Sequence, residues 1–247
     1  MNLVSAYIMS IKLNNKKRGD AYPFTMNAIK NLDELHFSAP ITFFIGDNGS
    51  GKSTLLEGIA AAYGFNPEGG SKNFSFSTSD THSSLSDHLI LAKGFRKAKD
   101  GYFLRAESFY NVATEIDELN KDYFSPPLLP AYGGVSLHEL SHGESFTALI
   151  NNRFSGHGLY LLDEPEAALS PIAQIAALKR MHELVNKESQ FIIATHSPIL
   201  LAYPYAEIFQ FTSDGIQKVN YQDTMFYALY KRIINDPAYI KEFIEET

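Results

Sequence analysis

A chain of 247 residues with 45% hydrophobic and 20% charged residues has the composition of an ordinary globule that can bury a substantial core. Its net charge of −7 argues against a broadly basic nucleic-acid-binding surface, and the lack of cysteine excludes disulfides and thiolate metal sites. No apolar run reaches the roughly 18–20 residues of a membrane span, and the N-terminus lacks the character of a signal peptide. We therefore expect a single domain over residues 1–247, in a cytoplasmic protein with no transmembrane segment of its own.

The first predicted elements lead into a glycine-rich loop. Residues 3–13 alternate as in a strand, and residues 22–37 are predicted to form a further strand pair. Residues 41–45 form a short apolar run, which predicts a buried strand directly before the loop. Apolar residues then recur at helical spacing over 55–63, and Gly64 stands where a helix takes its C′ glycine.

The next part of the chain, residues 65–140, is predicted to be a helical and irregular insertion. It is expected to contain a short helix near 83–92, a strand over 102–110 and a helix over 112–120. A loop rich in proline and glycine follows.

In the second half of the chain, the pattern predicts strands that alternate with helices. The expected elements are a helix starting just after Ser141, a strand over 158–162, a helix over 171–184 capped by Ser170, a strand over 191–194 and a last helix near 238–246. Such alternation implies an α/β fold with a mostly parallel sheet flanked by helices.

A phosphate-binding loop is the most specific motif, because Gly46–Thr54 satisfies G-x-x-x-x-G-K-[ST] between a predicted strand and a predicted helix. Its glycines let backbone N–H groups surround phosphate oxygens. Lys52 is expected to reach the β- and γ-phosphates, Ser53 to bind Mg²⁺, and Thr54 to contact the α-phosphate. The predicted nucleotide contacts are Gly46, Asp47, Asn48, Gly49, Ser50, Gly51, Lys52, Ser53 and Thr54. A glycine-rich turn that arose by chance is the alternative.

Two acidic residues follow the apolar strand over 158–162. Asp163 is expected to hold Mg²⁺ through water, and Glu164 to orient and deprotonate the attacking water. Glu166 is expected to have no direct part in the chemistry. The alternative is an acidic helix-capping cluster over 163–166.

A histidine follows the next apolar strand, and Ser197-Pro198 comes after it. The imidazole of His196 can hydrogen-bond the γ-phosphate and so respond to its presence, although a lone histidine in this position can also be structural. Because the carboxyl ends of parallel strands share one edge of a sheet, the phosphate loop, Asp163 and His196 are expected to meet there.

A second anion site is predicted at Ser141-His142-Gly143-Glu144. The Ser141 hydroxyl and the backbone N–H groups around Gly143 and Glu144, at a helix start, can cap the γ-phosphate that another subunit binds. A helix with an ordinary Ser-x-x-Glu N-cap is the alternative.

With these motifs, the chain resembles ABC-type ATPases across nearly its whole length. The sequences of three segments look like those of stand-alone bacterial ATPases that are often classed with the AAA family. These segments are residues 140–145, 162–171 and 194–198. Such ATPases are similar to the heads of chromosome-maintenance, recombination-repair and overcoming-lysogenisation-defect proteins. The resemblance implies an ABC-type ATPase head with an antiparallel β subdomain. It also implies ATP and Mg²⁺ as ligands, and an ATP-dependent head-to-tail homodimer in which the loop at 168–170 crosses between subunits.

Several positions depart from that family's pattern. The family has a glutamine that senses Mg²⁺ between the P-loop and the signature, whereas no glutamine lies between residues 55 and 139, and Glu107 or Ser108 is the nearest candidate. His142 replaces the family's common glycine. Tyr22 and Phe24 could stack on adenine or belong to the core. The guanine-reading Asn-Lys-x-Asp pattern is absent, which favours ATP over GTP.

Three functions remain open at this point. The first is an ATPase whose dimerisation switches a partner protein or DNA, as in repair or defence. The alternative is the nucleotide-binding subunit of an ABC membrane transporter, and the third is a module that binds ATP without hydrolysis. The positive clusters at 16–18 and 96–99 are either solvated loops or contacts to a phosphate backbone.

Overall fold

The computed structural model describes residues 6–14, 21–71, 84–105, 109–121 and 127–245. Within these residues, the central sheet has six strands in the order β5-β6-β7-β3-β8-β9. The first five are parallel, and β9 pairs antiparallel with β8. The strands are β3 (Ile41–Gly46), β5 (Asp100–Leu104), β6 (Gly158–Asp163), β7 (Gln190–Ala194), β8 (Ala206–Thr212) and β9 (Gly215–Val219).

The register of the central strands brings three strand ends to the same level. Asp163 of β6 is opposite Ala194 of β7, and Ala194 is opposite Phe44 of β3. All residues of β3 and β7 are buried, because helices or the second sheet cover both faces of the central sheet. The segments that leave these strands therefore start side by side, as expected for a ligand site at the carboxyl edge of a parallel sheet.

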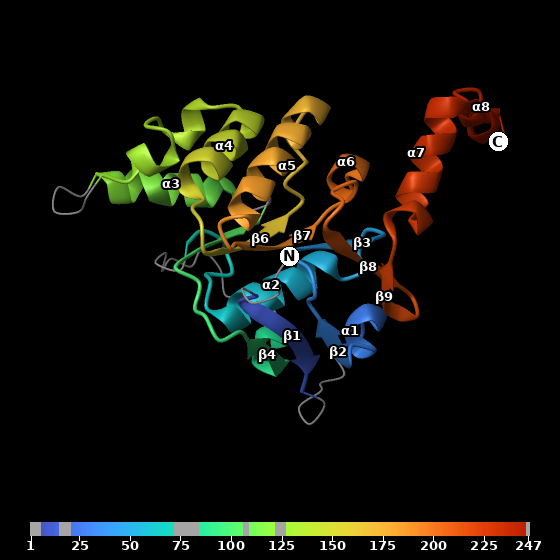
Figure 1. The fold of residues 1–247 in the computed structure, drawn as a ribbon, viewed down its shortest axis with the longest axis horizontal. Helices are drawn as coiled ribbons and strands as arrows, with labels where there is room; N and C mark the ends of the chain where they lie inside the picture. The colour runs from blue at the N-terminus through green and yellow to red at the C-terminus, as the bar shows by residue number, and fades with distance from the viewer. Residues whose placement is uncertain (1–5, 15–20, 72–83, 106–108, 122–126, 246–247) are drawn as a thin grey trace.

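A smaller antiparallel sheet lies on one side of the central sheet, with the order β2-β1-β4. Its strands are β1 (Ile8–Leu13), β2 (Glu34–His36) and β4 (Leu89–Lys93), and the short helix α1 (Asn27–Lys30) precedes β2. Helix α2 (Lys52–Tyr63) contacts strands of both sheets and lies between them (Figure 1). Leu55, Leu56 and Ile59 of α2 are fully buried in the apolar cluster that joins the two layers.

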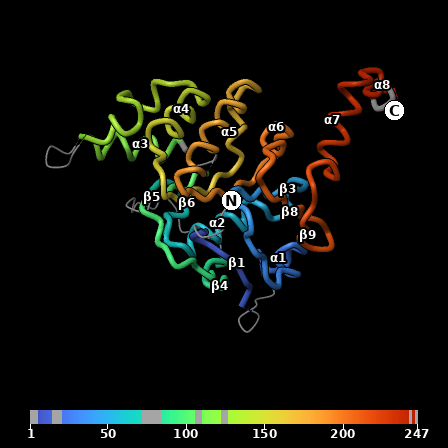
Figure 2. The backbone as a smooth tube through the Cα atoms, in the orientation of Figure 1, coloured from blue at the N-terminus to red at the C-terminus, as the bar shows by residue number. Residues whose placement is uncertain are grey.

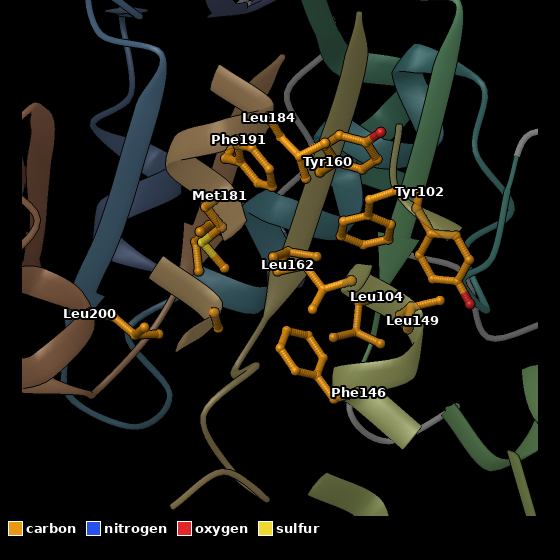
Figure 3. Close-up of a cluster of buried hydrophobic side chains, with 14 of the residues drawn as sticks. Tyr102, Leu104, Phe146, Leu149, Tyr160, Leu162, Met181, Leu184, Phe191 and Leu200 are labelled. Carbon is orange, nitrogen blue, oxygen red and sulfur yellow. The ribbon is translucent and has the colours of Figure 1, made fainter. Parts of the chain in front are cut away.

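Helices cover the opposite face of the central sheet (Figure 1). They include α3 (Phe109–Asn120), α4 (His142–Ala148), α5 (Pro171–Val185) and α6 (Pro198–Leu201). Figure 3 shows the apolar side chains that gather between sheet and helices, among them Tyr102, Leu104, Phe146, Leu149, Tyr160, Leu162, Met181, Leu184, Phe191 and Leu200.

Two C-terminal helices, α7 (Met225–Asn235) and α8 (Tyr239–Glu245), lead away from the sheet. They and α3 lie at opposite ends of the molecule's longest dimension (Figure 2). None of the α7 residues is buried. No helix of the described part of the chain has the length and apolar character needed to cross a bilayer.

Most predicted elements are confirmed, and the first errors fall before β5. Helix α2 ends at Gly64, whose φ of +102° gives it the left-handed conformation expected of a C′ glycine. Instead of the strand pair predicted over 22–37, the structure has α1 followed by β2. Instead of the helix predicted near 83–92, it has a 3₁₀ turn over Ser84–His88 and then β4, because hydrogen bonds to β1 hold this segment extended.

Two further expectations need correction. Residues 65–140 are predicted to be a helical and irregular insertion with one strand. The structure has β4 there, which belongs to the smaller sheet, as well as β5, which belongs to the central sheet. The strand predicted over 102–110 ends at Leu104, and α3 begins at Phe109. The sequence pattern also missed β8, β9 and α7.

Candidate active site

The phosphate loop connects β3 to α2, and its glycines are required by geometry. Gly46 has φ +145°, and a Cβ on it would lie 2.5 Å from the carbonyl oxygen of Phe211. Gly49 and Gly51 also have positive φ, at +76° and +102°. Only glycine adopts these conformations without strain, so the loop can turn sharply around a bound anion.

Lys52 is the first residue of α2 and is only 4% exposed. Its Nζ donates hydrogen bonds to the carbonyl oxygens of Gly46 and Asp47, both at 2.9 Å. Burial lowers the pKa of Lys52 below its usual value, while nearby carboxylates, Glu164 foremost, act in the opposite direction. The Oγ of Ser50, in the same loop, is buried and has no hydrogen-bond partner within the described part of the chain. An ammonium group and an unpaired hydroxyl inside a glycine cradle fit a phosphate group.

An oxygen pair lies at the start of α2. The Oγ of Ser53 donates a hydrogen bond of 2.9 Å to Oδ1 of Asp163, which joins the loop to the end of β6. A hydroxyl and a carboxylate are the hard oxygen ligands that Mg²⁺ prefers, and Mg²⁺ commonly takes its remaining ligands from water and substrate phosphates. The predicted Ser53 and Asp163 pair is therefore assembled and fits the ion.

Glu164 begins the loop after β6 in an unusual conformation, with φ +46°. A non-glycine residue in this region is uncommon and costs about 1 kcal/mol or more. Its backbone N–H donates to the carbonyl oxygen of Ala194 at 2.9 Å, which ties the loop to β7. Its Oε1 lies 3.6 Å from Nε2 of His196, and this nitrogen is buried with no hydrogen-bond partner in the segments that the structure describes. The two predicted side chains are thus neighbours at the predicted edge.

The signature segment starts α4 with a reciprocal N-cap. The N–H of Glu144 donates to Oγ of Ser141 at 3.3 Å, while Oε2 of Glu144 accepts bonds from the Ser141 N–H and hydroxyl at 2.9 and 2.7 Å. These bonds from Ser141 lower the pKa of Glu144. The structure therefore contains the capping arrangement that was the alternative for this motif.

Gly143 packs directly on the loop that follows β6. A Cβ on Gly143 would lie 2.6 Å from the backbone oxygen of Ala168, so any larger residue must displace that loop. Ser141, Gly143, Glu144 and residues 168–170 line one cavity of about 660 Å³. This cavity has no phosphate-loop residue in its lining. The signature therefore does not face the phosphate loop of the same chain across this cavity.

Comparisons with known proteins agree with this architecture. A family model described as an AAA domain matches residues 24–121. The chain superposes on the ADP conformation of MJ1267, an ATP-binding cassette of an ABC transporter, with a TM-score of 0.52 and 18% identity, over 97% of this chain and 99% of that chain. The chain has the P-loop fold of ABC-type ATPases.

Two curated relatives match a smaller share of the chain than MJ1267 does. The probable siderophore transport system ATP-binding protein YusV of Bacillus subtilis (strain 168) is 28% identical over 191 residues, which are 71% of this chain and 69% of the relative. The petrobactin import ATP-binding protein FpuD of Bacillus anthracis is 27% identical over 192 residues, 71% and 70% of the two chains.

An aromatic ring lies beside the phosphate loop of the ATPase. The hydroxyl of Tyr22 is 3.0 Å from Oγ1 of Thr54, and Tyr22 is 63% exposed. Phe24 is buried and packs edge-on against His88. Of the two aromatic residues considered for adenine, Phe24 therefore belongs to the core and Tyr22 remains a candidate.

Three observations complete the placement of the predicted residues in the ATPase. His142 lines a cavity of about 380 Å³ together with Asp163 and Glu164 of the same chain. The Mg²⁺-sensing candidates Glu107 and Ser108, and the basic cluster at 16–18, lie outside the described residues. Sequence reasoning missed a contact of Glu166, whose Oε1 accepts a hydrogen bond of 2.6 Å from the backbone N–H of His196. No local pattern signals this contact.

Proposed function

We propose that this ATPase is the nucleotide-binding subunit of an ABC membrane transporter, acting at the cytoplasmic face as a single domain. The observation that supports this proposal most directly is the similarity to YusV and FpuD, whose names describe ATP-binding proteins of siderophore transport and petrobactin import. Each alignment extends over about 70% of both chains, so the similarity is not limited to the phosphate loop.

The geometry supports the following roles for the site residues. The phosphate loop from Gly46 to Thr54 binds the triphosphate, with Lys52 as the fixed cation. Ser53 and, through water, Asp163 would hold Mg²⁺, which would neutralise charge on the phosphate oxygens.

Hydrolysis needs a base that orients and deprotonates water, and we assign this role to Glu164. Its carboxylate stands at the end of β6, one residue beyond Asp163, and His196 lies 3.6 Å away. In this role Glu164 accepts a proton from the attacking water, while His196 donates a hydrogen bond to the γ-phosphate. The strained backbone at Glu164 is held by its bond to Ala194, so the backbone that carries the carboxylate is positioned before substrate binds.

Phosphate release by wild type and Glu164→Gln tests this assignment. We expect turnover to fall at least about 10²-fold, because the amide cannot accept the proton of water, with ATP affinity unchanged. Glu183→Gln is the matched control, since Glu183 pairs only with Arg180 among the contacts described on the surface of α5. Equal turnover in wild type and Glu164→Gln would remove Glu164 from the role of base.

A second candidate function is a switch that acts on a soluble partner or DNA. It is favoured by the signature sequence Ser141-His142-Gly143-Glu144 and by Ser197-Pro198 after the histidine, where Ser197 caps α6. The net charge of −7 disfavours DNA as the partner.

Affinity purification of the Glu164→Gln protein with ATP and Mg²⁺ from detergent-solubilised cells separates the two functions. The transporter function predicts recovery of integral membrane proteins with several spans, and no change of the wild-type ATPase rate when DNA is added. DNA stimulation without membrane partners would favour the switch.

A further inference from the structure

The loops that follow β6 and β7 are joined at two points. The first is the backbone bond from Glu164 N–H to the Ala194 carbonyl, at 2.9 Å. The second involves a side chain and joins residues that are 30 positions apart, because Oε1 of Glu166 accepts a hydrogen bond from the backbone N–H of His196. At 2.6 Å this is a short bond, as expected for a carboxylate acceptor.

The remaining atoms of this pair are unusual. Oε2 of Glu166 and Nε2 of His196 are both buried and have no hydrogen-bond partner among the described residues. Leaving buried polar atoms unpaired is costly, and native structures contain few of them. One carboxylate oxygen of Glu166 is unpaired among the described residues, and the other accepts a hydrogen bond from a single amide. This arrangement is better explained by a role in positioning His196 than by a contribution to stability.

The contact has a consequence for the imidazole. The His196 backbone begins the segment after β7, and its ring packs edge-on against Phe226 of α7 at 5.7 Å. With the amide fixed by Glu166 and the ring supported by Phe226, Nε2 lies 3.6 Å from Oε1 of Glu164. Without the Glu166 carboxylate, the backbone of His196 no longer has this hydrogen bond to the loop that carries Glu164.

We propose that Glu166 is a positioning residue for hydrolysis, which holds the backbone of His196 so that the imidazole and the Glu164 carboxylate face the same point. This inference rests on the proposed roles of Glu164 and His196. Glu166 acts through its acceptor oxygen and its length, and its charge is not required. Glutamine keeps the acceptor and the length, aspartate is one methylene too short, and alanine removes the contact.

The first test measures the contact itself in the nucleotide-free protein. We expect amide hydrogen exchange of His196, resolved by NMR, to accelerate about tenfold or more in Glu166→Ala and to stay within about threefold of wild type in Glu166→Gln. The neighbouring amide of Ser197 is an internal control, because it donates to Oγ1 of Thr195 and is not bonded to Glu166. Glu183→Ala controls for the loss of a glutamate elsewhere.

The second test separates positioning from a structural role. In Glu166→Ala, kcat should fall about tenfold or more while KM for ATP changes less than about threefold, because the phosphate-loop contacts are untouched. Glu166→Gln should restore kcat, and Glu166→Asp should not.

Each outcome has a definite meaning. Unchanged exchange at His196 in Glu166→Ala, or a kcat equal to wild type, overturns the inference. A Glu166→Gln variant as slow as Glu166→Ala also overturns it, because the charge would then be needed. Wild-type protein that releases no phosphate contradicts the proposed function instead, and the exchange experiment still decides whether Glu166 holds His196.

Discussion

At the scale of single residues, Tyr22 stands out because it exposes an aromatic ring next to a phosphate-binding loop. Its hydroxyl contacts Thr54, so the ring lies near the end of the loop that is expected to contact the α-phosphate. We predict that Tyr22→Ala weakens ATP binding by about 1 kcal/mol, roughly fivefold, through loss of stacking on the base. Titration with a fluorescent ATP analogue measures this change.

Tyr22→Phe distinguishes the ring from the hydroxyl in the same titration. If stacking is the cause, phenylalanine retains wild-type affinity, whereas loss of affinity in Tyr22→Phe would assign the effect to the bond with Thr54. Tyr110→Ala is a suitable control, because Tyr110 is 70% exposed on α3 and packs against His138. Unchanged affinity in Tyr22→Ala would exclude the ring from the adenine contact.

Residue-scale prediction from the sequence works where the motif is local. Lys52 and Ser53 belong to one short loop, and Asp163 and Glu164 end one apolar strand, so spacing alone predicts their shared edge. The bond from Glu166 to His196 joins two loops, and the register of β6 and β7 that brings them together cannot be read from either segment.

At the scale of elements, Gly143 determines how closely α4 packs on the loop after β6. A methyl group there meets the Ala168 oxygen at 2.6 Å, and a backbone oxygen cannot rotate away. We predict that Gly143→Ala lowers the free energy of unfolding by about 1–3 kcal/mol. Urea unfolding measures this, and His142→Ala in the same helical turn, where the side chain is exposed, should change it by less than about 0.5 kcal/mol. Equal stability of Gly143→Ala and wild type would show that the loop moves aside freely.

A second element-scale contact joins β8 to the segment before β3. The buried carboxylate of Glu207 accepts bonds from the Ser38 N–H at 2.8 Å, from Thr42 at 3.0 Å and from Lys218 at 2.7 Å. Burial alone raises the pKa of Glu207, but the bonds from Lys218 and Ser38 outweigh it and the pKa is lowered. Stability from this group is therefore fully present above the unfolded-state pKa of about 4.3, and is lost as pH falls through the lowered folded-state pKa.

We predict that Glu207→Gln lowers the free energy of unfolding at pH 7 by about 2–3 kcal/mol, because charge-assisted bonds are replaced by neutral ones. The difference from wild type should shrink below about pH 4. Urea unfolding at several pH values measures both effects. Glu34→Gln is the control, because the Glu34 side chain on β2 is 40% exposed. A difference that stays constant from pH 3 to 7 would show that the charge of Glu207 does not matter.

Element prediction failed where tertiary pairing decided the conformation. Residues 89–93 are compatible with a helix by local pattern, but they are the edge partner of β1. Residues 27–30 form α1 because they pack on β8 and β9, which the sequence pattern did not reveal. The buried strands β3, β6 and β7 and the helix α5 were predictable, since their apolar runs and N-cap are strong local signals.

At the scale of the whole molecule, the cavity that Ser141, Gly143 and Glu144 line among the described residues has no phosphate-loop residue in its lining, which disfavours contact of both motifs of one chain with the same phosphate. A head-to-tail pair of chains would do so. We predict that Glu164→Gln sediments as a dimer with saturating ATP and Mg²⁺ and as a monomer without them. A protein that remains monomeric under these conditions would refute the dimer.

Complementation between two disabled chains tests whether that dimer is head-to-tail. Lys52→Ala in the Glu164→Gln background should not hold the triphosphate. Ser141→Asp in the same background keeps a good N-cap for α4 but places a negative charge where the γ-phosphate is capped. Each protein alone should stay monomeric with ATP and Mg²⁺, since neither can build a complete pocket. Their mixture should form a heterodimer, because the intact phosphate loop of one chain can then meet the intact signature of the other. Dimers of either variant alone, or none in the mixture, would mean that the two motifs do not complete each other's site.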